Sequence, residues 1–275
     1  MIVSFHPCID ADLQILLGDR LPNKEELRYI NNAEAIILPQ GCSKELFKVC
    51  LSSKASIFPD YKCRFEYSGK IKQIILFKNI NMPYPCSICW DNIEKFYKIR
   101  TKFADKTPFL IKENNKHEGK GIHIVKHIDD IKGTYNALKQ SDGIIAQELI
   151  NCNGDVLRVV IIGDMLFSYW KRAYNPEQVI VTVNDSAYID YKWAPHLQEK
   201  GKELVKILIH KTGINLAAVD IVFKDKTTPL LLEINYYFGR KGLGGTEKYY
   251  KLLVAAIKKW LNCQHLDSNK IKLSY

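Results

Sequence analysis

Two strongly apolar segments toward the C-terminal end each carry one acidic residue. Asp220 lies in AAVDIVF, and Glu233 lies in PLLLEIN, two positions before Asn235. Residues two apart on a strand share a face, and antiparallel pairing through KDKTTP can bring Asp220 beside them. Two carboxylates in one site repel unless a cation intervenes, and Mg²⁺ binds such oxygens together with nucleotide phosphates. These residues predict a Mg²⁺ site, with Mn²⁺ as a substitute; the alternative is a structural acid paired with a Lys or Arg.

A second group of residues suits phosphate binding. In PFLIKENNKHEGKGIHIV, Lys112 ends one predicted strand, and Gly119, Lys120 and Gly121 precede the next. Glycine lets backbone N–H groups approach phosphate oxygens, and lysine adds a positive charge. The GxxxxGK[ST] and GxGxxG spacings of other nucleotide sites are absent from this segment. Taken alone, a Gly-Lys-Gly hairpin is more often a solvated turn.

The elements that must position these residues follow from the spacing of apolar residues. Residues 1–68 alternate apolar runs with helical patterns, which predicts a small α/β domain with a partly parallel sheet and a helix capped by Ser43. Beyond Pro108, strand patterns dominate and include a hairpin about Gly163 and Asp164. The predicted helices are GKIKQIILFKN, DNIEKFYKIRTKF, DDIKGTYNALKQ, HLQEKGKELVKILIHKTG ending near Gly213, and EKYYKLLVAAIKKWL.

Composition limits the classes of protein that fit this chain. Its 275 residues are 47% hydrophobic, enough for a substantial core. No run of about eighteen apolar residues and no signal-peptide pattern is present, so we expect a cytoplasmic protein. The eight cysteines are scattered and are expected to be mostly free thiols. Cys86 and Cys89 form a single CxxC, a weak zinc or redox signal; the alternative is a helix that begins after Pro85.

The order of these motifs resembles the sequence plan of the ATP-grasp superfamily, and most closely its RimK-like branch, the ribosomal-protein glutamate ligases. The motifs are Lys112, the glycine loop, Gln147-Glu148-Leu149, Arg158, Asp220 and Glu233-x-Asn235. The resemblance covers roughly residues 60–262. It implies an α/β (α+β) class and an ATP-grasp fold. In this fold two antiparallel-sheet lobes hold ATP, and a small α/β pre-ATP-grasp domain precedes them in the sequence. The expected domains are 1–68 and 69–275, with the small lobe at about 105–148 and the large lobe at about 149–275.

The resemblance also implies roles for individual residues. Lys70 and Lys112 would contact the ATP phosphates beneath a flexible lid at 114–121 that contains Gly119, Lys120 and Gly121. Gln147, Glu148 and Leu149 would meet adenine through the backbone, and Asp155 would bind ribose. Arg158, Arg172 and Lys112 are the catalytic candidates, because arginine can donate two parallel bonds to phosphate or carboxylate oxygens. Asp220, Glu233 and Asn235 would hold the metal.

Three departures from the family pattern concern the ribose and substrate sites. Asp155 and Arg158 are one residue further apart than is usual in the family, and Asn184 stands in for the usual asparagine. Beyond Asn235, the usual Ser-Pro-Gly turn is replaced by YYFGRKGLGG. This loop predicts that Arg240 and Lys241 contact an anionic group of the acceptor substrate.

The implied activity is ATP-dependent, ADP-forming ligation of a carboxylate to an amine or another nucleophile through an acyl phosphate. The expected partners are small-molecule or peptide carboxylates and amines, with no nucleic acid and no membrane; a homo-oligomer stays open. One alternative is an ATP-binding kinase or scaffold without ligation. Another is a nucleic-acid-binding protein, which would suit the net charge of +10 and the tyrosines among lysines in KYYKLL.

Overall fold

The N-terminal part of the chain forms a small parallel sheet. The computed structural model describes residues 1–95, 107–116, 121–175 and 187–274. Its first sheet has the strand order β3-β1-β4-β5, and every pair in it is parallel, where a partly parallel sheet was predicted. Parallel neighbours need crossover connections, which α1 and α2 supply. The elements are β1 (Ile2–Ser4), β2 (Ile9–Asp10), β3 (Leu13–Gln14), α1 (Lys24–Asn32), β4 (Ala35–Ile37), α2 (Lys44–Leu51) and β5 (Ser56–Phe58). Ser43 caps α2, accepting a bond from the Leu46 amide.

A second, antiparallel sheet has the order β6-β9-β7-β8 and packs against α7 around its own apolar core. Its elements are β6 (Ser87–Trp90), β7 (Phe109–Glu113), β8 (Ile122–Val125), the short helix η1 (Ile128–Asp130), α7 (Ile131–Leu138) and β9 (Ile144–Glu148). The interpretation of Pro85 as a helix start is wrong, because β6 follows it and pairs with β9. Cross-strand packing outweighed the local proline signal at this position. The predicted helix DNIEKFYKIRTKF lies mostly outside the described residues.

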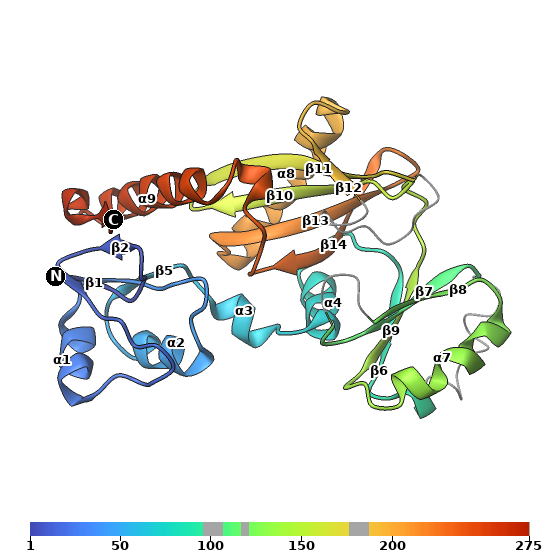
Figure 1. Cartoon of the computed structure of the whole chain (residues 1–275), viewed down its shortest axis with the longest axis horizontal. Helices are drawn as coiled ribbons and strands as arrows, with labels where there is room; N and C mark the ends of the chain where they lie inside the picture. Colours follow the sequence, from blue (N-terminus) through green and yellow to red (C-terminus); the bar gives the residue numbers. More distant parts are fainter. Residues whose placement is uncertain (96–106, 117–120, 176–186, 275) are drawn as a thin grey trace.

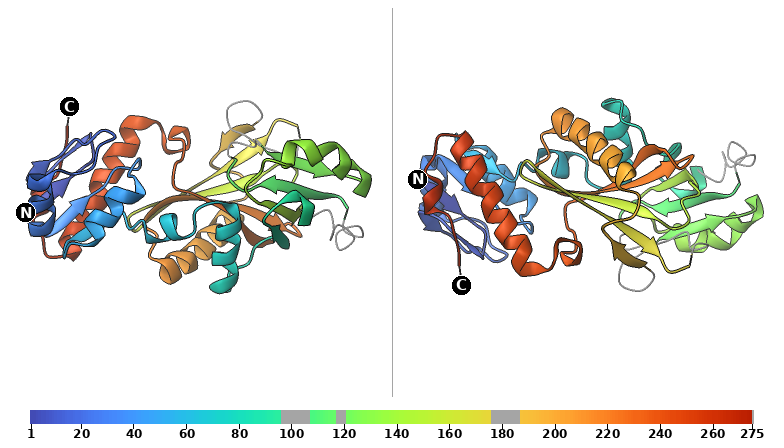
Figure 2. Two further views of the ribbon diagram at one scale, coloured as in Figure 1. Left: turned by 90° about the horizontal axis from the view of Figure 1, so that it is seen from below. Right: turned by 90° about the horizontal axis from the view of Figure 1, so that it is seen from above.

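The largest sheet has five antiparallel strands in the order β12-β11-β10-β13-β14. The strands are β10 (Val156–Ile162), β11 (Met165–Ala173), β12 (Ala187–Asp190), β13 (Leu216–Lys224) and β14 (Thr228–Asn235). Gly163, with φ of +62°, makes the predicted hairpin turn between β10 and β11. Helix α8 (Pro195–Thr212) covers one face and ends at Gly213 in the left-handed conformation (Figure 2).

Two helical segments connect the three sheets. Helices α3 (Lys62–Glu66) and α4 (Lys70–Asn79) lead from the first sheet into the space between the other two (Figure 1). After β14 come η2 (Lys241–Leu243), α9 (Thr246–Cys263), η3 (Ser268–Lys270) and β15 (Lys272–Leu273), which pairs with β2. The apolar face of α9 shares a core with β1, β4 and β10, so this last helix binds the N-terminal sheet to the five-stranded one. The division at residue 68 stays a prediction.

All eight cysteines are free, as predicted. Among the helices of the described ranges, none is long and apolar enough to cross a bilayer.

Candidate functional site

One face of the five-stranded sheet carries a row of charged side chains. The backbone register places Arg158 opposite Asp220, and Asp220 opposite Glu233. Directly paired residues of antiparallel strands project to the same face, so these side chains lie side by side. Lys171 joins them, because it lies two residues beyond Tyr169, the partner of Arg158. We call Lys171, Arg158, Asp220 and Glu233 the charged row; two cations on β11 and β10 meet two acids on β13 and β14.

A β-bulge determines that Glu233 belongs to this row. Near the turn, Lys224 pairs with Thr228, and this register continues to Ile221 and Leu231. Continued without a break, it would place Glu233 opposite Val219, whose side chain packs in the core with α8. The register shifts at Asp220, leaving Leu232 as the extra residue. This shift turns Glu233 and Asn235 to the face that carries Asp220.

Asp220 is the most heavily bonded residue of the row. Arg158 Nε and Nη2 donate to its two carboxylate oxygens at 2.8 Å each, and Lys171 Nζ donates at 2.9 Å. Asn235 Nδ2 adds a longer contact of 3.3 Å. Burial alone would raise the pKa of Asp220, but Arg158 and Lys171 hold the pKa well below its usual range. The sequence left open whether this acid pairs with a Lys or Arg, and the structure shows that it pairs with both Arg158 and Lys171.

The donor set is compatible with a hard divalent cation. Glu233 is half-buried, and its side chain makes no hydrogen bond to another described residue. Two carboxylates and the amide oxygen of Asn235 suit Mg²⁺, which keeps part of its shell for water and phosphate oxygens. No group of three His, Cys, Asp or Glu residues is gathered in the described ranges, so these ranges form no zinc-type cluster. The CxxC of Cys86 and Cys89 is no exception.

Two lysines approach the charged row from the other side. Lys112, buried on β7, donates to Gln147 Oε1 at 2.6 Å, and Gln147 in turn donates to Ser87 Oγ at 2.9 Å. Burial lowers the pKa of Lys112 to about 8, an effect that Glu233 opposes and Lys70 reinforces. Burial also lowers the pKa of Lys70, again against the attraction of Glu233. Both amines thus interact electrostatically with Glu233 across the gap between the two sheets.

The other described residues predicted for the nucleotide site lie on or next to α4, β8 and β9. Lys70 begins α4 and donates to the carbonyl of Lys116. Glu148 ends β9 and accepts a bond from Lys224 at 2.8 Å, and Leu149 follows it. Gly121, with φ of +68°, directly precedes β8. Gly119, Lys120 and Asn184 lie outside the described residues, as does half of the predicted lid at 114–121.

Arg172 and Asp155 are not part of the charged row. Arg172 follows Lys171 on β11 and therefore projects to the opposite face of the sheet. There it donates to Asp155 at 3.3 Å and to Asp190 at 3.4 Å, with its guanidinium carbon 4.2 Å from the Trp193 ring centroid. The extra residue between Asp155 and Arg158 is consistent with this separation, since an odd spacing places two side chains on opposite faces.

Sequence reasoning missed Lys171, although a usable signal was present. A two-residue turn at Gly163-Asp164 fixes the hairpin register, which pairs Arg158 with Tyr169 and Val156 with Lys171. Counting outward from the turn would have placed Lys171, and not Arg172, on the face of Arg158.

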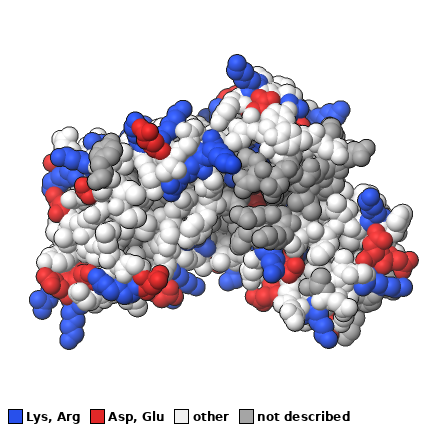
Figure 3. All heavy atoms as spheres, in the orientation of Figure 1, with Lys and Arg blue, Asp and Glu red and all other residues white. Residues whose placement is uncertain are grey.

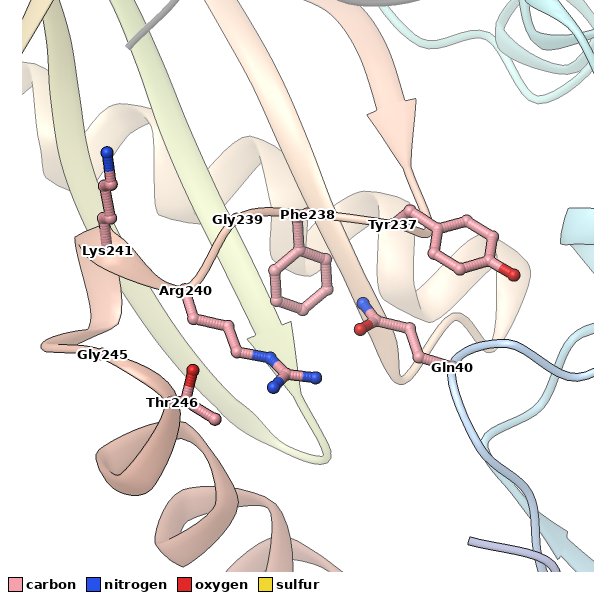
Figure 4. Close-up of a pocket in the computed structure, with 8 residues that line it drawn as sticks. All are labelled: Gln40, Tyr237, Phe238, Gly239, Arg240, Lys241, Gly245 and Thr246. Atoms are coloured by element: carbon pink, nitrogen blue, oxygen red, sulfur yellow. The ribbon is translucent and has the colours of Figure 1, made fainter. Parts of the chain in front are cut away.

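The loop after Asn235 opens into a pocket of about 510 Å³ (Figure 4). The guanidinium carbon of Arg240 lies 4.7 Å and 4.6 Å from the ring centroids of Tyr249 and Tyr250. Figure 4 shows Arg240 beside Thr246, whereas the side chain of Lys241 points away from both. The pocket is lined by Gln40, Tyr237, Phe238, Gly239, Arg240, Lys241, Gly245 and Thr246.

This pocket adjoins the charged row through a close packing contact. A Cβ atom on Gly242 would lie 2.0 Å from the ring of Tyr169, so only glycine fits there. Tyr169 is the cross-strand partner of Arg158. The loop that carries Arg240 therefore packs on the same face as the charged row.

The arrangement of the two antiparallel sheets is that of the ATP-grasp fold, as solved structures show. A RimK-domain ATP-grasp protein from Sphaerobacter thermophilus is 13% identical, with a TM-score of 0.58 over 92% of this chain and 97% of that one. VanG D-Ala:D-Ser ligase from Enterococcus faecalis is 14% identical, with a TM-score of 0.61 over 82% and 72%. N5-carboxyaminoimidazole synthetase from Staphylococcus aureus, solved with ADP, is 14% identical, with a TM-score of 0.62 over 86% and 64%.

The family follows from the sequence comparison. The model of the RimK-like ATP-grasp domain matches residues 68–258, and the chain belongs to this family. The predicted resemblance and fold class are thereby confirmed. No curated protein matches the chain. It spans 57% of the length of the carboxyaminoimidazole ribonucleotide synthase from Aspergillus clavatus, another structure that it matches.

Proposed function

We propose that the chain is an ADP-forming ligase that uses MgATP to activate a carboxylate as an acyl phosphate and then joins it to an amine or another nucleophile. The observation that carries the proposal is the meeting of Lys112 and Lys70 with the acidic end of the charged row, between the two sheets of an ATP-grasp fold. Paired cations and acids in such a gap suit a polyphosphate with its metal. We also propose a cytoplasmic location, where ATP is available.

The proposed roles follow from the positions of the side chains. Lys112 and Lys70 offset the phosphate charge, while Gln147, Glu148 and Leu149 line the adenine side and Asp155 the ribose side. Asp220, Glu233 and Asn235 would hold Mg²⁺, which neutralises charge on the phosphate oxygens. Arg158 and Lys171 adjoin this metal site and would stabilise the transferred phosphoryl group. Arg172 lies on the opposite face of the sheet and would act by holding Asp155 in place. Gly119, Lys120 and Gly121 belong to the loop proposed to cover the phosphates.

The reaction requires no side-chain nucleophile. A substrate carboxylate oxygen attacks the terminal phosphorus and ADP leaves. The amine then attacks the acyl carbon, loses a proton and expels inorganic phosphate. The protein contributes orientation, charge and exclusion of water, because an acyl phosphate exposed to solvent would hydrolyse.

Two other classes of protein would behave differently from a ligase. A kinase would release ADP and leave a stable phosphorylated product without a new amide, and a scaffold would bind ATP without turnover. A nucleic-acid-binding protein would present a basic surface, but on the face drawn in Figure 3 the described Lys and Arg side chains are interspersed with Asp and Glu. The ligase proposal also accounts for the acids of the charged row, which nucleic-acid binding leaves unexplained.

A screen of amino acids, peptides and small carboxylic acids, alone and in pairs, tests the proposal. We expect one acid to stimulate ADP release in the presence of Mg²⁺, and mass spectrometry to find a product equal to acid plus amine minus water. Formation of AMP would refute activation through an acyl phosphate, and a stable phosphorylated acid with every amine tested would refute ligation.

Nucleotide affinity is expected to depend on pH through Lys112. Its pKa of about 8 means that the amine is charged below this pH and loses its proton above it. Only the charged amine attracts phosphate, so affinity should fall above the pKa, with a limiting slope of about tenfold per pH unit. Isothermal titration calorimetry with ADP measures this, and Lys112→Met should bind weakly without the alkaline decline. An identical decline in Lys112→Met would assign it to another group.

Arg240 is expected to govern acceptor binding. Arg240→Ala removes a charged donor from the pocket, which should raise the acceptor KM or lower kcat by about 10- to 100-fold. ATP affinity should hardly change, since the proposed partner of Arg240 is the acceptor. Lys248→Ala, which removes an exposed cation in the first turn of α9, is the control. Equal loss of ATP and acceptor binding would move Arg240 to the phosphates; no kinetic change would limit Arg240 to its packing on Tyr249 and Tyr250.

A further inference from the structure

Gln73 makes an unusual pair of hydrogen bonds to the strand that carries Glu233. Its side chain is buried on α4, and Nε2 donates to the carbonyl of Ile234 at 2.9 Å. In return, Oε1 of Gln73 accepts from the Ile234 amide, also at 2.9 Å. One carboxamide thus satisfies both backbone groups of a single residue, as a neighbouring β-strand would.

Ile234 lies between Glu233 and Asn235, the two proposed metal ligands on strand β14. Strand β14 is the edge of the five-stranded sheet, so backbone groups that point away from β13 have no strand to pair with. A backbone group buried without a partner costs free energy comparable to that of a lost hydrogen bond. The carboxamide of Gln73 removes this cost at the position where Glu233 and Asn235 must hold their orientation.

Hydrogen bonds to groups outside the sheet lie on both sides of the β-bulge. On one side of the extra residue Leu232, the Leu231 amide donates to the carbonyl of Pro83 at 2.9 Å; on the other side lies Ile234. A bulge disrupts the local ladder, and a regular register would turn Glu233 away from Asp220. External hydrogen bonds on both sides of Leu232 favour the bulged register over the regular one.

Gln73 also connects this strand to the other sheet. It lies one turn after Lys70 on α4, and the N-terminus of α4 is bonded by Asn114, whose Oδ1 accepts from the Ile71 amide at 3.0 Å. Asn114 directly follows β7, the strand of Lys112. The helix therefore bridges the lysine strand and the acid strand through two side-chain amides.

We infer that Gln73 is a positioning residue that holds the β-bulge of β14 and so keeps Glu233 and Asn235 directed at the metal. This inference rests on the proposed function for the identity of the metal ligands. Residues that orient metal ligands from behind typically change metal affinity by about 10- to 100-fold when they are replaced. Gln73 itself touches neither nucleotide nor metal in this account.

The test compares ADP binding with Mn²⁺ and with EDTA, so that the ratio of the two affinities isolates the contribution of the metal. Gln73→Met keeps the length of the side chain and removes both hydrogen bonds, and it should reduce the ratio by about 10- to 100-fold. Gln198→Met is the matched control. Gln198 is also a buried helical glutamine that bonds loop carbonyls, those of Tyr191 and Trp193, but it lies on α8 behind the sheet. Its replacement should lower stability and leave the ratio unchanged.

Glu233→Gln separates failure of this inference from failure of the proposed function. If Glu233→Gln leaves the ratio unchanged, the metal assignment itself is wrong. If Glu233→Gln abolishes the metal effect and Gln73→Met does not reduce it, the role of Gln73 is refuted. Adding Gln73→Met to Glu233→Gln should cause no further loss, because Glu233→Gln alone already abolishes the metal effect through which Gln73 acts.

Hydrogen exchange tests the geometry in the unaltered chain, whether or not Gln73→Met folds. The Ile234 amide should exchange slowly although it belongs to an edge strand, because Gln73 accepts its hydrogen bond. In Gln73→Met the Ile234 amide should lose protection, while amides of β10 keep theirs. An Ile234 amide that exchanges in the wild-type chain at the rate of an unprotected residue would refute the inference.

Discussion

Replacing Glu233 with glutamine is expected to lower acid-stimulated ADP release by about 10²- to 10³-fold, the usual cost of removing one preorganised charge-stabilising group. The substitution keeps the shape of the side chain and removes its charge. Glu233 makes no ion pair within the described residues that would be broken, so the free energy of unfolding should barely change. A coupled assay for ADP, together with urea unfolding, measures both quantities.

The control for Glu233→Gln is Glu199→Gln, an exposed acid on α8. It should retain wild-type turnover. Normal ADP release by Glu233→Gln would remove Glu233 from the metal site and leave the charged row as a structural network.

Asp220→Asn is expected to destabilise the fold as well as the activity. Asp220 is the shared partner of Arg158 and Lys171, both nearly buried, so its neutralisation leaves two cations without their counter-charge. Breaking a buried pair by removing one partner typically costs about 3–5 kcal/mol. Urea unfolding at neutral pH should show a loss of this size, so lost turnover in this variant would not by itself identify a metal ligand.

The pH dependence of stability provides the check on Asp220. Its pKa in the folded state lies below the ordinary value of 3.8, so its contribution is present above that pH and is lost as the pH falls through the folded-state pKa. Asp220→Asn should therefore lack this part of the acid destabilisation. Adding Lys171→Met should recover part of the lost stability, since one uncompensated cation is removed. Wild-type stability in Asp220→Asn would contradict the observed network.

Much of the fold could be predicted from the sequence, because apolar spacing and turn residues determine local structure. The hairpin of β10 and β11 follows from Gly163, and the end of α8 follows from Gly213, which must adopt a positive φ. The parallel N-terminal sheet follows from alternating short strands and helices. Strand β6 was missed because its four residues have no period of their own and pair with β9 about 57 residues later.

Most residues of the site were predicted from the sequence, but the register of β13 and β14, which brings them together, was not. Asp220 and Glu233 share a face only because Leu232 is bulged, and no turn residue marks that position. The hydrogen bonds of Gln73 depend on the packing of α4 against β14, which joins residues 161 positions apart. Local sequence patterns carry no information on such contacts. The choice between Lys171 and Arg172, by contrast, was available from the hairpin register.

The most direct test of the account follows the oxygen atoms of the carboxylate. The acid that stimulates ADP release is labelled with ¹⁸O in its carboxyl group and incubated with MgATP, the amine and the protein. Because a carboxylate oxygen attacks the terminal phosphorus and stays with it when the amine displaces phosphate, the account predicts one ¹⁸O atom in the inorganic phosphate for each amide formed. Unlabelled phosphate, or label in AMP, would contradict activation through an acyl phosphate.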